Sequence, residues 1–203
     1  MTRVKVCGIR SVAEAFWAVK AGAWAVGFIL APSPRRLDVD EAARIIRRLP
    51  ARIIKVGVFV DEEFEQVKYT VRHTGLNMLQ FHGQESPEYC QEWAVPVIKS
   101  FRVKDRESLA GVKKYEVFAH LFDTYQEGSY GGTGRTFDWR HLSVLDSDPR
   151  VILAGGLNCS NVAGAVRLLR PFAVDVSSGV EVNGSKDRWL IEEFVSRARP
   201  EHG

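Results

Sequence analysis

Short apolar runs alternate with longer amphipathic segments from one end of the chain to the other. The run Ile53–Val60 has the length and the β-branched content of a buried strand. The segment after it, Glu62–Thr74, carries apolar side chains three and four residues apart, which is the spacing of one face of a helix. Asp61 before this segment and Gly75 after it are typical cap residues. The pattern therefore predicts a strand followed by a capped helix.

The same alternation repeats along the rest of the sequence, and it predicts eight strand–helix units. The predicted strands are Val4–Ile9, Ala25–Leu30, Ile53–Val60, Met78–His82, Pro96–Arg102, Val117–Asp123, Val151–Ala154 and Phe172–Ser177. The predicted helices are Ser11–Ala21, a segment from Asp38 or Asp40 to Leu49, Glu62–Thr74, one beginning at Ser86-Pro87, Arg106–Lys114, Trp139–Leu145, one capped near Asn158 or Ser160 that ends by Pro171, and Asp187–Ala198.

Strict alternation of strands and helices indicates parallel strands joined by helical crossovers. Eight units without a linker or a break in composition favour an α/β fold, a single (β/α)8 TIM barrel domain over residues 1–203. The alternative is an open Rossmann-type sheet. That fold places a GxGxxG motif after its first strand, where this chain has Cys7-Gly8-Ile9-Arg10.

Composition narrows the classes of protein that remain. The 203 residues are 45% hydrophobic with a net charge of +3, which suits one soluble domain and lacks the basic excess of a nucleic-acid binder. The longest apolar run, Ala23–Ala31, is shorter than the roughly 20 residues of a membrane span. Cys7, Cys90 and Cys159 show neither disulfide nor zinc-ligand spacing. We expect a cytoplasmic protein with reduced thiols, no bound metal and no membrane or nucleic-acid partner; its oligomeric state is left open.

The first strand places chemistry inside the predicted barrel. Successive side chains of a strand alternate between faces, so Val4 and Val6 share one face while Lys5 and Cys7 share the other. The valines are suited to packing against a helix. Lys5 and Cys7 are therefore expected to point into the barrel, with Cys7 at the carboxyl end of the strand. Taken alone, Cys7 is equally consistent with a small buried hydrophobic residue.

Active sites of such barrels lie at the carboxyl ends of the strands. Cys7, His82, Asp123 and Ser177 each end a predicted strand, so they are expected to meet at one mouth. Asp123 follows the apolar run Val117–Phe122, where burial of a carboxyl group without a role would be unfavourable. A cap for the following loop is the alternative role for this residue.

Two glycine-rich turns predict a phosphate site. They follow the seventh and eighth strands, where barrels commonly bind phosphate through backbone N–H groups. Two simple tight turns are the alternative. The candidate phosphate-binding residues are Gly155, Gly156, Ser177, Ser178 and Gly179.

Two further loops are candidates for contacts with the substrate. Pro32–Arg36 follows the second strand and presents two guanidinium groups, whose planar shape matches a carboxylate. Arg36 is the preferred candidate, although both arginines are also consistent with a solvated surface. Tyr130–Arg135 is long and glycine-rich, which suits either a mobile lid or a solvated linker.

The full chain resembles the phosphoribosylanthranilate isomerase family of tryptophan biosynthesis. The resemblance depends on the order and spacing of many short motifs, each weak alone. They are Lys5–Gly8, Ala25–Phe28, Ser33–Arg36, Val56–Val60, Gln80–Gly83, Phe122–Thr124, Gly131–Gly134, Phe137–Trp139, Leu153–Leu157 and Val174–Glu181. Phe81 departs from the family pattern, which more often has leucine before His-Gly.

The resemblance implies an Amadori rearrangement of N-(5′-phosphoribosyl)anthranilate to its 1-deoxyribulose isomer, without metal or cofactor. It implies that Cys7 is the general base, that Asp123 is the general acid, and that Arg36 binds the anthranilate carboxylate. His82 is expected to be a further contact of the substrate. One acid and one base suffice for this chemistry. The two glycine-rich turns would hold the phosphate.

Three other functions remain as alternatives. The first is the related aminoaldose isomerase of histidine biosynthesis, which has an aspartate where Cys7 stands. The second is a barrel that binds a phosphorylated ligand without catalysis, which would not need both Cys7 and Asp123. The third is a phosphosugar epimerase, which would need paired carboxylates or metal-binding histidines at the strand ends.

Two expectations concern electrostatics. The acid must be protonated while the base is ionised, so the site should lower the pKa of Cys7, raise that of Asp123, or do both. Lys5 and Asp175 should lie at similar depth on the first and eighth strands, which are neighbours in a closed barrel. We expect them to form a buried ion pair, with Lys99 and Gln80 as further partners. Barrel shear that separates the two strands is the alternative.

Overall fold

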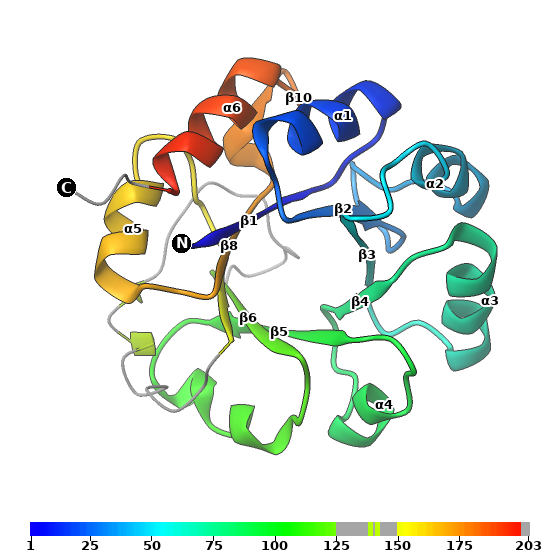
Figure 1. Cartoon of the computed structure of the whole chain (residues 1–203). Coiled ribbons are helices and arrows are strands. Elements are labelled where there is room, and N and C mark those ends of the chain that lie inside the picture. The colour runs from blue at the N-terminus through cyan, green and yellow to red at the C-terminus, as the bar shows by residue number, and fades with distance from the viewer. Residues whose placement is uncertain (125–137, 140, 143–149, 200–203) are drawn as a thin grey trace.

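Parallel strands close into a barrel in the computed structural model, in the order β1 to β8 (Figure 1). The structure describes residues 1–124, 138–139, 141–142 and 150–199. The barrel strands are β1 (Arg3–Cys7), β2 (Ala25–Ile29), β3 (Ile54–Phe59), β4 (Met78–Phe81), β5 (Val97–Val103), β6 (Ala119–Thr124), β7 (Val151–Leu153) and β8 (Ala173–Val176). The predicted TIM barrel is therefore confirmed, and the open sheet is wrong.

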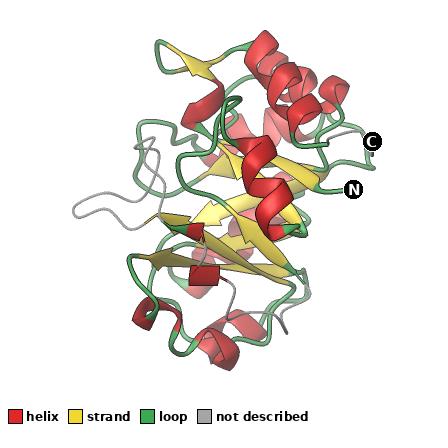
Figure 2. Cartoon of the chain, turned by 90° about the vertical axis from the view of Figure 1, so that its left-hand side faces the viewer, coloured by secondary structure: helices red, strands yellow, loops and turns green. Residues whose placement is uncertain are grey.

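Helices surround the barrel, as Figure 1 shows. Those in the described residues are α1 (Val12–Ala21), α2 (Val39–Ile46), α3 (Phe64–Thr74), α4 (Pro87–Gln91), α5 (Val162–Leu169) and α6 (Arg188–Arg197). After β8 the chain also forms a small antiparallel hairpin, β9 (Glu181–Val182) and β10 (Ser185–Lys186). In the side view of Figure 2 the N-terminus marks the pole where the strands begin.

Polar caps set the starts of four helices where the sequence predicts them. The side chains of Ser11, Asp38, Ser86 and Asp187 each accept a hydrogen bond from the main-chain N–H three residues later. Such a bond satisfies an N–H that has no partner inside the helix. Asp38, rather than Asp40, opens α2, and Glu41 bonds back to it in a capping box.

Two expectations about helices are wrong. Asp61 does not cap α3, because its carboxylate accepts a hydrogen bond from Gln84 N–H across to the next loop. Asp61 itself has a left-handed φ of 49°, and α3 begins only at Phe64. The segment Arg106–Lys114 is two short 3-10 turns rather than one helix, since Gly111 between them has a φ of 93°.

The start of helix α5 differs from the predicted one because of a polar turn before it. Asn158 accepts hydrogen bonds from the N–H and hydroxyl of Ser160, at 2.8 and 2.6 Å, so it closes its own turn instead of capping a helix. Helix α5 begins later, at Val162. The predicted lid Tyr130–Arg135 and most of the predicted helix Trp139–Leu145 lie outside the described residues.

Strand alternation produces two separate apolar cores. The larger core lies between strands and helices and includes Val4 and Val6, as the first strand predicts. The smaller core fills the inside of the barrel with residues such as Val56, Ile98 and Leu121. Phe81 belongs to the outer core, where it packs against the rings of Tyr89 and Trp93. The departure from the family pattern at Phe81 therefore affects packing outside the barrel.

A charged pair lies inside the barrel beneath the mouth. Lys5 and Asp175 are direct partners in the register of β1 with β8, and Lys5 Nζ lies 2.9 Å from Asp175 Oδ1. The Lys5 side chain is fully buried. The predicted ion pair is confirmed, and shear does not separate the two strands.

The two further partners suggested for this pair do not join it. Lys99 follows Ile98 of the inner core, so it points outward, where its ammonium contacts Glu85 Oε2 at 2.8 Å and the Gly83 carbonyl at 2.7 Å. The amide of Gln80 does point inward, but it bonds to His82.

Candidate active site

The carboxyl ends of the barrel strands bring the predicted chemical groups to one mouth. Cys7 is the last residue of β1, and Asp123 is the last but one of β6. His82 and Ser177 directly follow β4 and β8. Because all these strands are parallel, the four side chains belong to the same pole of the barrel.

Asp123 is a buried carboxyl group with few hydrogen bonds. The N–H of Thr124 donates to Oδ1 at 2.7 Å, and His82 Nε2 lies 3.6 Å from Oδ2. Gly155 packs directly against the carboxyl group, since an ideal Cβ there would lie 2.8 Å from Oδ1. Burial, helped by the charge of Asp175, raises the pKa of Asp123 to about 6, although Thr124 N–H opposes the change. A group of this pKa can donate a proton near neutral pH.

His82 is an uncharged neighbour of this carboxyl group. Burial, together with the positive charges of Arg102, Lys5 and Lys99, lowers the pKa of His82 to about 3. The side-chain amide of Gln80 lies 3.2 Å from His82 Nδ1, and the other ring nitrogen, Nε2, faces Asp123. The imidazole is therefore placed to donate a hydrogen bond to the Asp123 carboxylate after its proton has left.

The Cys7 thiol is almost completely buried, with 6% of the residue exposed. Burial raises its pKa, and the nearby ammonium of Lys5 opposes that effect without overcoming it. Gly27 on the neighbouring strand leaves room for the sulfur, because even an ideal Cβ there would lie 2.7 Å from Sγ. The expectation that at least one of the two groups has a suitably shifted pKa is met by Asp123, while the pKa of Cys7 shifts in the other direction.

The loop after β2 holds its two arginines, Arg35 and Arg36, in different surroundings. Arg35 has 18% of its side chain exposed, and both oxygens of Glu181 accept hydrogen bonds from it. Its Cδ lies next to Gly8, the residue that follows Cys7. Arg36 is exposed, and among the described residues its side chain has no hydrogen bond or ion pair. The role of Arg36 as a contact of the substrate carboxylate therefore stays a prediction, and its guanidinium is available for it.

The turns after β7 and β8 pack against each other. Gly155 and Gly156 have left-handed φ values of 82° and 67°, and their N–H groups donate to no other described residue. Gly179 has no room for a side chain, since its ideal Cβ would overlap the main chain of Leu157. The two turns thus form a single backbone surface next to Ser177 and Ser178, with N–H groups available to an anion.

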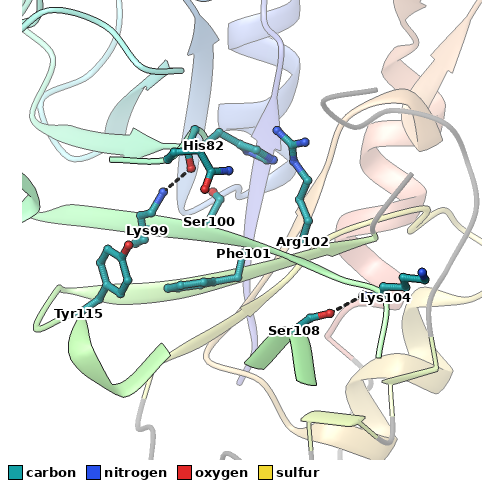
Figure 3. A pocket seen from close by; sticks show the side chains of 10 residues that line it. His82, Lys99, Ser100, Phe101, Arg102, Lys104, Ser108 and Tyr115 are labelled. Carbon is teal, nitrogen blue, oxygen red and sulfur yellow. Dashed lines mark hydrogen bonds between the residues drawn. The ribbon is translucent and has the colours of Figure 1, made fainter. Parts of the chain in front are cut away.

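Arg102 is a residue of the mouth that the sequence reasoning missed. It pairs with Asp123 in the register of β5 with β6, on the face of β5 that points inward. Figure 3 shows its guanidinium and the His82 ring at one side of a pocket of about 500 Å³, with Lys104 and Ser108 farther along. Its position at the end of a predicted strand was a usable signal, the same one that identified Asp123.

No group of three or more histidine, cysteine or acidic side chains lies together as a metal site within the described residues. Among the helices that the structure describes, none is both long and apolar enough to cross a membrane.

Comparison with known proteins gives a consistent set of relatives. The model of the N-(5′-phosphoribosyl)anthranilate (PRA) isomerase family matches residues 4–197. A protein of that name from Syntrophomonas wolfei is 54% identical over 197 residues, 97% of each chain. The crystal structure of phosphoribosyl anthranilate isomerase from Thermotoga maritima has a TM-score of 0.91 and 39% identity, with 98% of each chain covered. Another isomerase structure contains reduced 1-(o-carboxyphenylamino)-1-deoxyribulose 5-phosphate and has a TM-score of 0.88, 39% identity and 98% of each chain covered.

Proposed function

The chain belongs to the N-(5′-phosphoribosyl)anthranilate isomerase family, and from that premise we propose how the residues of its mouth divide the reaction. The protein is an aldose–ketose isomerase of tryptophan biosynthesis, which converts N-(5′-phosphoribosyl)anthranilate to 1-(2-carboxyphenylamino)-1-deoxyribulose 5-phosphate. The histidine-pathway isomerase is not supported, since Cys7 stands where that enzyme has an aspartate.

The proposed mechanism uses Asp123 as acid and Cys7 as base. Asp123 donates its proton to the ribose ring oxygen, the bond from that oxygen to C1′ breaks, and the anthranilate nitrogen forms an imine with C1′. The Cys7 thiolate then removes the C2′ proton to give an enolamine. This intermediate becomes the ketone when C1′ gains a proton and the C2′ hydroxyl loses one. His82 is placed to stabilise the Asp123 carboxylate that the first step leaves.

The burial of the Asp123 carboxyl group, which raises its pKa, is the observation that carries this assignment. At pH 7 an ordinary aspartate is protonated at about one part in a thousand, because its pKa is about 3.9. Asp123, with a pKa of about 6, is protonated in roughly a tenth of the molecules. Burial raises the pKa of the Cys7 thiol and so lowers the fraction of thiolate. The gain in correctly protonated molecules therefore comes from Asp123.

We assign the anthranilate carboxylate to Arg36, whose exposed guanidinium has no partner among the described residues. Arg35 beside it is already paired with the carboxylate of Glu181. The phosphate at the other end of the substrate is assigned to the turns around Gly155–Gly156 and Ser177–Gly179. Backbone N–H groups are good donors to a phosphate.

The arginine assignment predicts different effects for adjacent substitutions. Arg36→Met should raise KM roughly tenfold to a hundredfold, because a hydrogen bond to a charged group contributes about 1.5–3 kcal/mol. Arg35→Met should leave KM within about threefold, because that guanidinium is already paired with Glu181. Steady-state kinetics with phosphoribosylanthranilate measure both. A larger effect of Arg35→Met would contradict the assignment of the carboxylate to Arg36.

The pKa values also predict the pH profile. Only molecules with Asp123 protonated and Cys7 ionised are active, and the acid has the lower pKa of the two. Their fraction therefore rises with pH up to the pKa of Asp123, stays level, and falls above the pKa of the thiol. The low-pH limb of kcat/KM should bend near pH 6 instead of near pH 4.

The substrate phosphate itself ionises near pH 6, so the assignment needs a measurement on the free protein. A ¹³C NMR titration of carboxyl-labelled aspartate, with Asp123→Asn to identify the signal, should give a midpoint near pH 6. A midpoint near 4 would show that burial does not retain the proton on Asp123.

We also propose the binding partners and the cellular location of the protein. The partner is a small phosphorylated molecule, with no nucleic acid and no membrane. A cytoplasmic location agrees with Cys7, Cys90 and Cys159, which are all free.

A further inference from the structure

Gln80 and His82 lie two residues apart at the end of β4, so both side chains belong to the inner face of the barrel. Only 2% of Gln80 and 9% of His82 is exposed. The side-chain amide nitrogen of Gln80 lies 3.2 Å from His82 Nδ1, and no other described residue forms a hydrogen bond with that ring nitrogen. One buried amide therefore determines the surroundings of Nδ1.

The other ring nitrogen faces the proposed acid. His82 Nε2 lies 3.6 Å from Asp123 Oδ2 and has no closer hydrogen-bond partner among the described residues. The second oxygen, Oδ1, accepts a hydrogen bond from Thr124 N–H. The imidazole thus lies between the Gln80 amide and the Asp123 carboxyl group, and when it is uncharged its single proton can point to only one of them.

Charge decides where that proton lies while Asp123 is ionised. His82 is uncharged at neutral pH, because burial and nearby positive charges lower its pKa to about 3. A ring N–H is attracted to a carboxylate, whereas a ring lone pair is repelled by it, so the proton is on Nε2 and Nδ1 is an acceptor. The charged groups that act on His82 or Asp123 from other described strands are Lys5 on β1, Lys99 and Arg102 on β5, and Asp175 on β8, with the Cys7 thiol at the same mouth.

The amide of Gln80 suits this tautomer. Its nitrogen faces Nδ1, and its oxygen has no hydrogen-bond partner among the described residues. A reversed amide would accept from Nδ1–H, but it would place two N–H groups where the oxygen now lies without a partner. Buried N–H groups without an acceptor are rarer in proteins than unpaired carbonyl oxygens. The observed orientation is therefore favoured, and it requires Nδ1 without a proton.

We propose that Gln80 is a positioning residue, which keeps the His82 proton on Nε2 whether Asp123 is ionised or protonated. The inference rests on the proposed role of Asp123 as the acid. Without the amide, a protonated Asp123 could donate to a bare Nε2, and the imidazole would hold the proton that the ribose ring oxygen needs. With the amide, Nε2 can only donate, so it leaves that proton free and stabilises the carboxylate that forms. Gln80 acts through His82 and does not contact the reacting atoms.

NMR of protein labelled with ¹⁵N in histidine reads the tautomer, because protonated and bare ring nitrogens have well-separated chemical shifts. His82→Asn identifies the signals. The unaltered protein should show Nε2–H at about pH 8 and at about pH 5, on either side of the pKa of Asp123. Gln80→Met should keep Nε2–H at about pH 8 but carry the proton on Nδ1 in at least about half of the molecules at about pH 5. The Asp123 midpoint in the ¹³C titration should then move to higher pH, since the imidazole accepts from the protonated form.

Two further variants complete the series. In Gln80→Glu an ionised carboxylate can only accept, so at about pH 8 the ring between it and Asp123 should carry a proton on each nitrogen. Ser100 lines the pocket of Figure 3 with His82, is 5% exposed, and its hydroxyl has no partner among the described residues. Ser100→Ala is the matched control, because it removes a buried polar group from the same pocket without a contact to the ring nitrogens. It should leave the tautomer unchanged at both pH values.

The outcomes separate this inference from the function it rests on. Nδ1–H in the unaltered protein at either pH would overturn the role of Gln80, and so would Nε2–H that persists at the lower pH in Gln80→Met. If Gln80→Met fails to fold, Gln80→Glu decides, since a bare Nδ1 in that variant at the higher pH would also overturn the role. Failure of the proposed acid would appear elsewhere, as a normal kcat in Asp123→Asn while the unaltered protein still shows Nε2–H.

Discussion

Replacing Cys7 with serine is expected to lower kcat by at least a hundredfold while the barrel stays folded. General acid and base groups contribute roughly 10²- to 10⁴-fold to a rate. A serine hydroxyl ionises far less readily than a thiol, so the variant has almost no base at any working pH. The serine fits in the space beside Gly27, which removes packing as an explanation. Steady-state kinetics and circular dichroism together measure the effect.

Cys90→Ser is the matched control for this experiment. Cys90 is also buried, but it lies in helix α4, outside the barrel interior. Its substitution should change kcat by less than about threefold. A Cys7→Ser protein with nearly normal kcat would place the base elsewhere in the mouth.

Asp123→Asn should produce a loss of similar size, again at least a hundredfold in kcat. The carboxamide keeps the shape of the side chain but cannot deliver the proton that opens the ribose ring. Substrate binding should change much less, since Asp123 contributes no charge to either anionic end of the substrate in this mechanism. A loss that appeared only in KM would remove Asp123 from the role of acid.

Breaking the ion pair inside the barrel is expected to have the largest effect on stability. Lys5→Met or Asp175→Asn alone should lower the free energy of unfolding by about 3–5 kcal/mol, because each leaves one charged or polar partner buried without its match. The double variant Lys5→Met/Asp175→Leu should lose much less, since the desolvation penalty disappears with the charges. Denaturant unfolding measures all three.

The surface pair Arg188–Glu192 provides the comparison for this series. It has a similar distance, 2.8 Å, but its side chains are 54% and 33% exposed. Glu192→Gln should therefore cost less than about 1 kcal/mol. If the double core variant lost as much stability as the two single variants added together, the two residues would be acting independently, and the pair would have no special energetic role.

Much of the fold could be predicted because alternation has a direct physical meaning. A period of two along β1 separates Val4 from Lys5, and the same rule places Asp175 opposite Lys5 once the strands of a barrel close. The helix caps followed from side-chain oxygens that accept an N–H within the same turn. Asp61 does not follow this local rule, because the N–H of Gln84 in another loop donates to its carboxylate.

The site was less predictable where loops decide orientation. Strand ends placed Cys7 and Asp123 correctly, since strand direction fixes their pole of the barrel. The pairing of Arg35 with Glu181, 146 residues away, is something that no local pattern reveals. Arg102 carried the strand-end signal and was overlooked.

The burial of Cys7 has a consequence for the life of the protein under oxidising conditions. Peroxide attacks thiolates that are exposed to solvent, and this sulfur is mostly protonated and has almost no contact with water. The environment that makes Cys7 a scarce base therefore also keeps it from conversion to sulfenic acid, and the same environment makes it a poor target for reagents that modify reactive cysteines. The burial of Cys7 thus accounts both for its low thiolate population and for its resistance to oxidation.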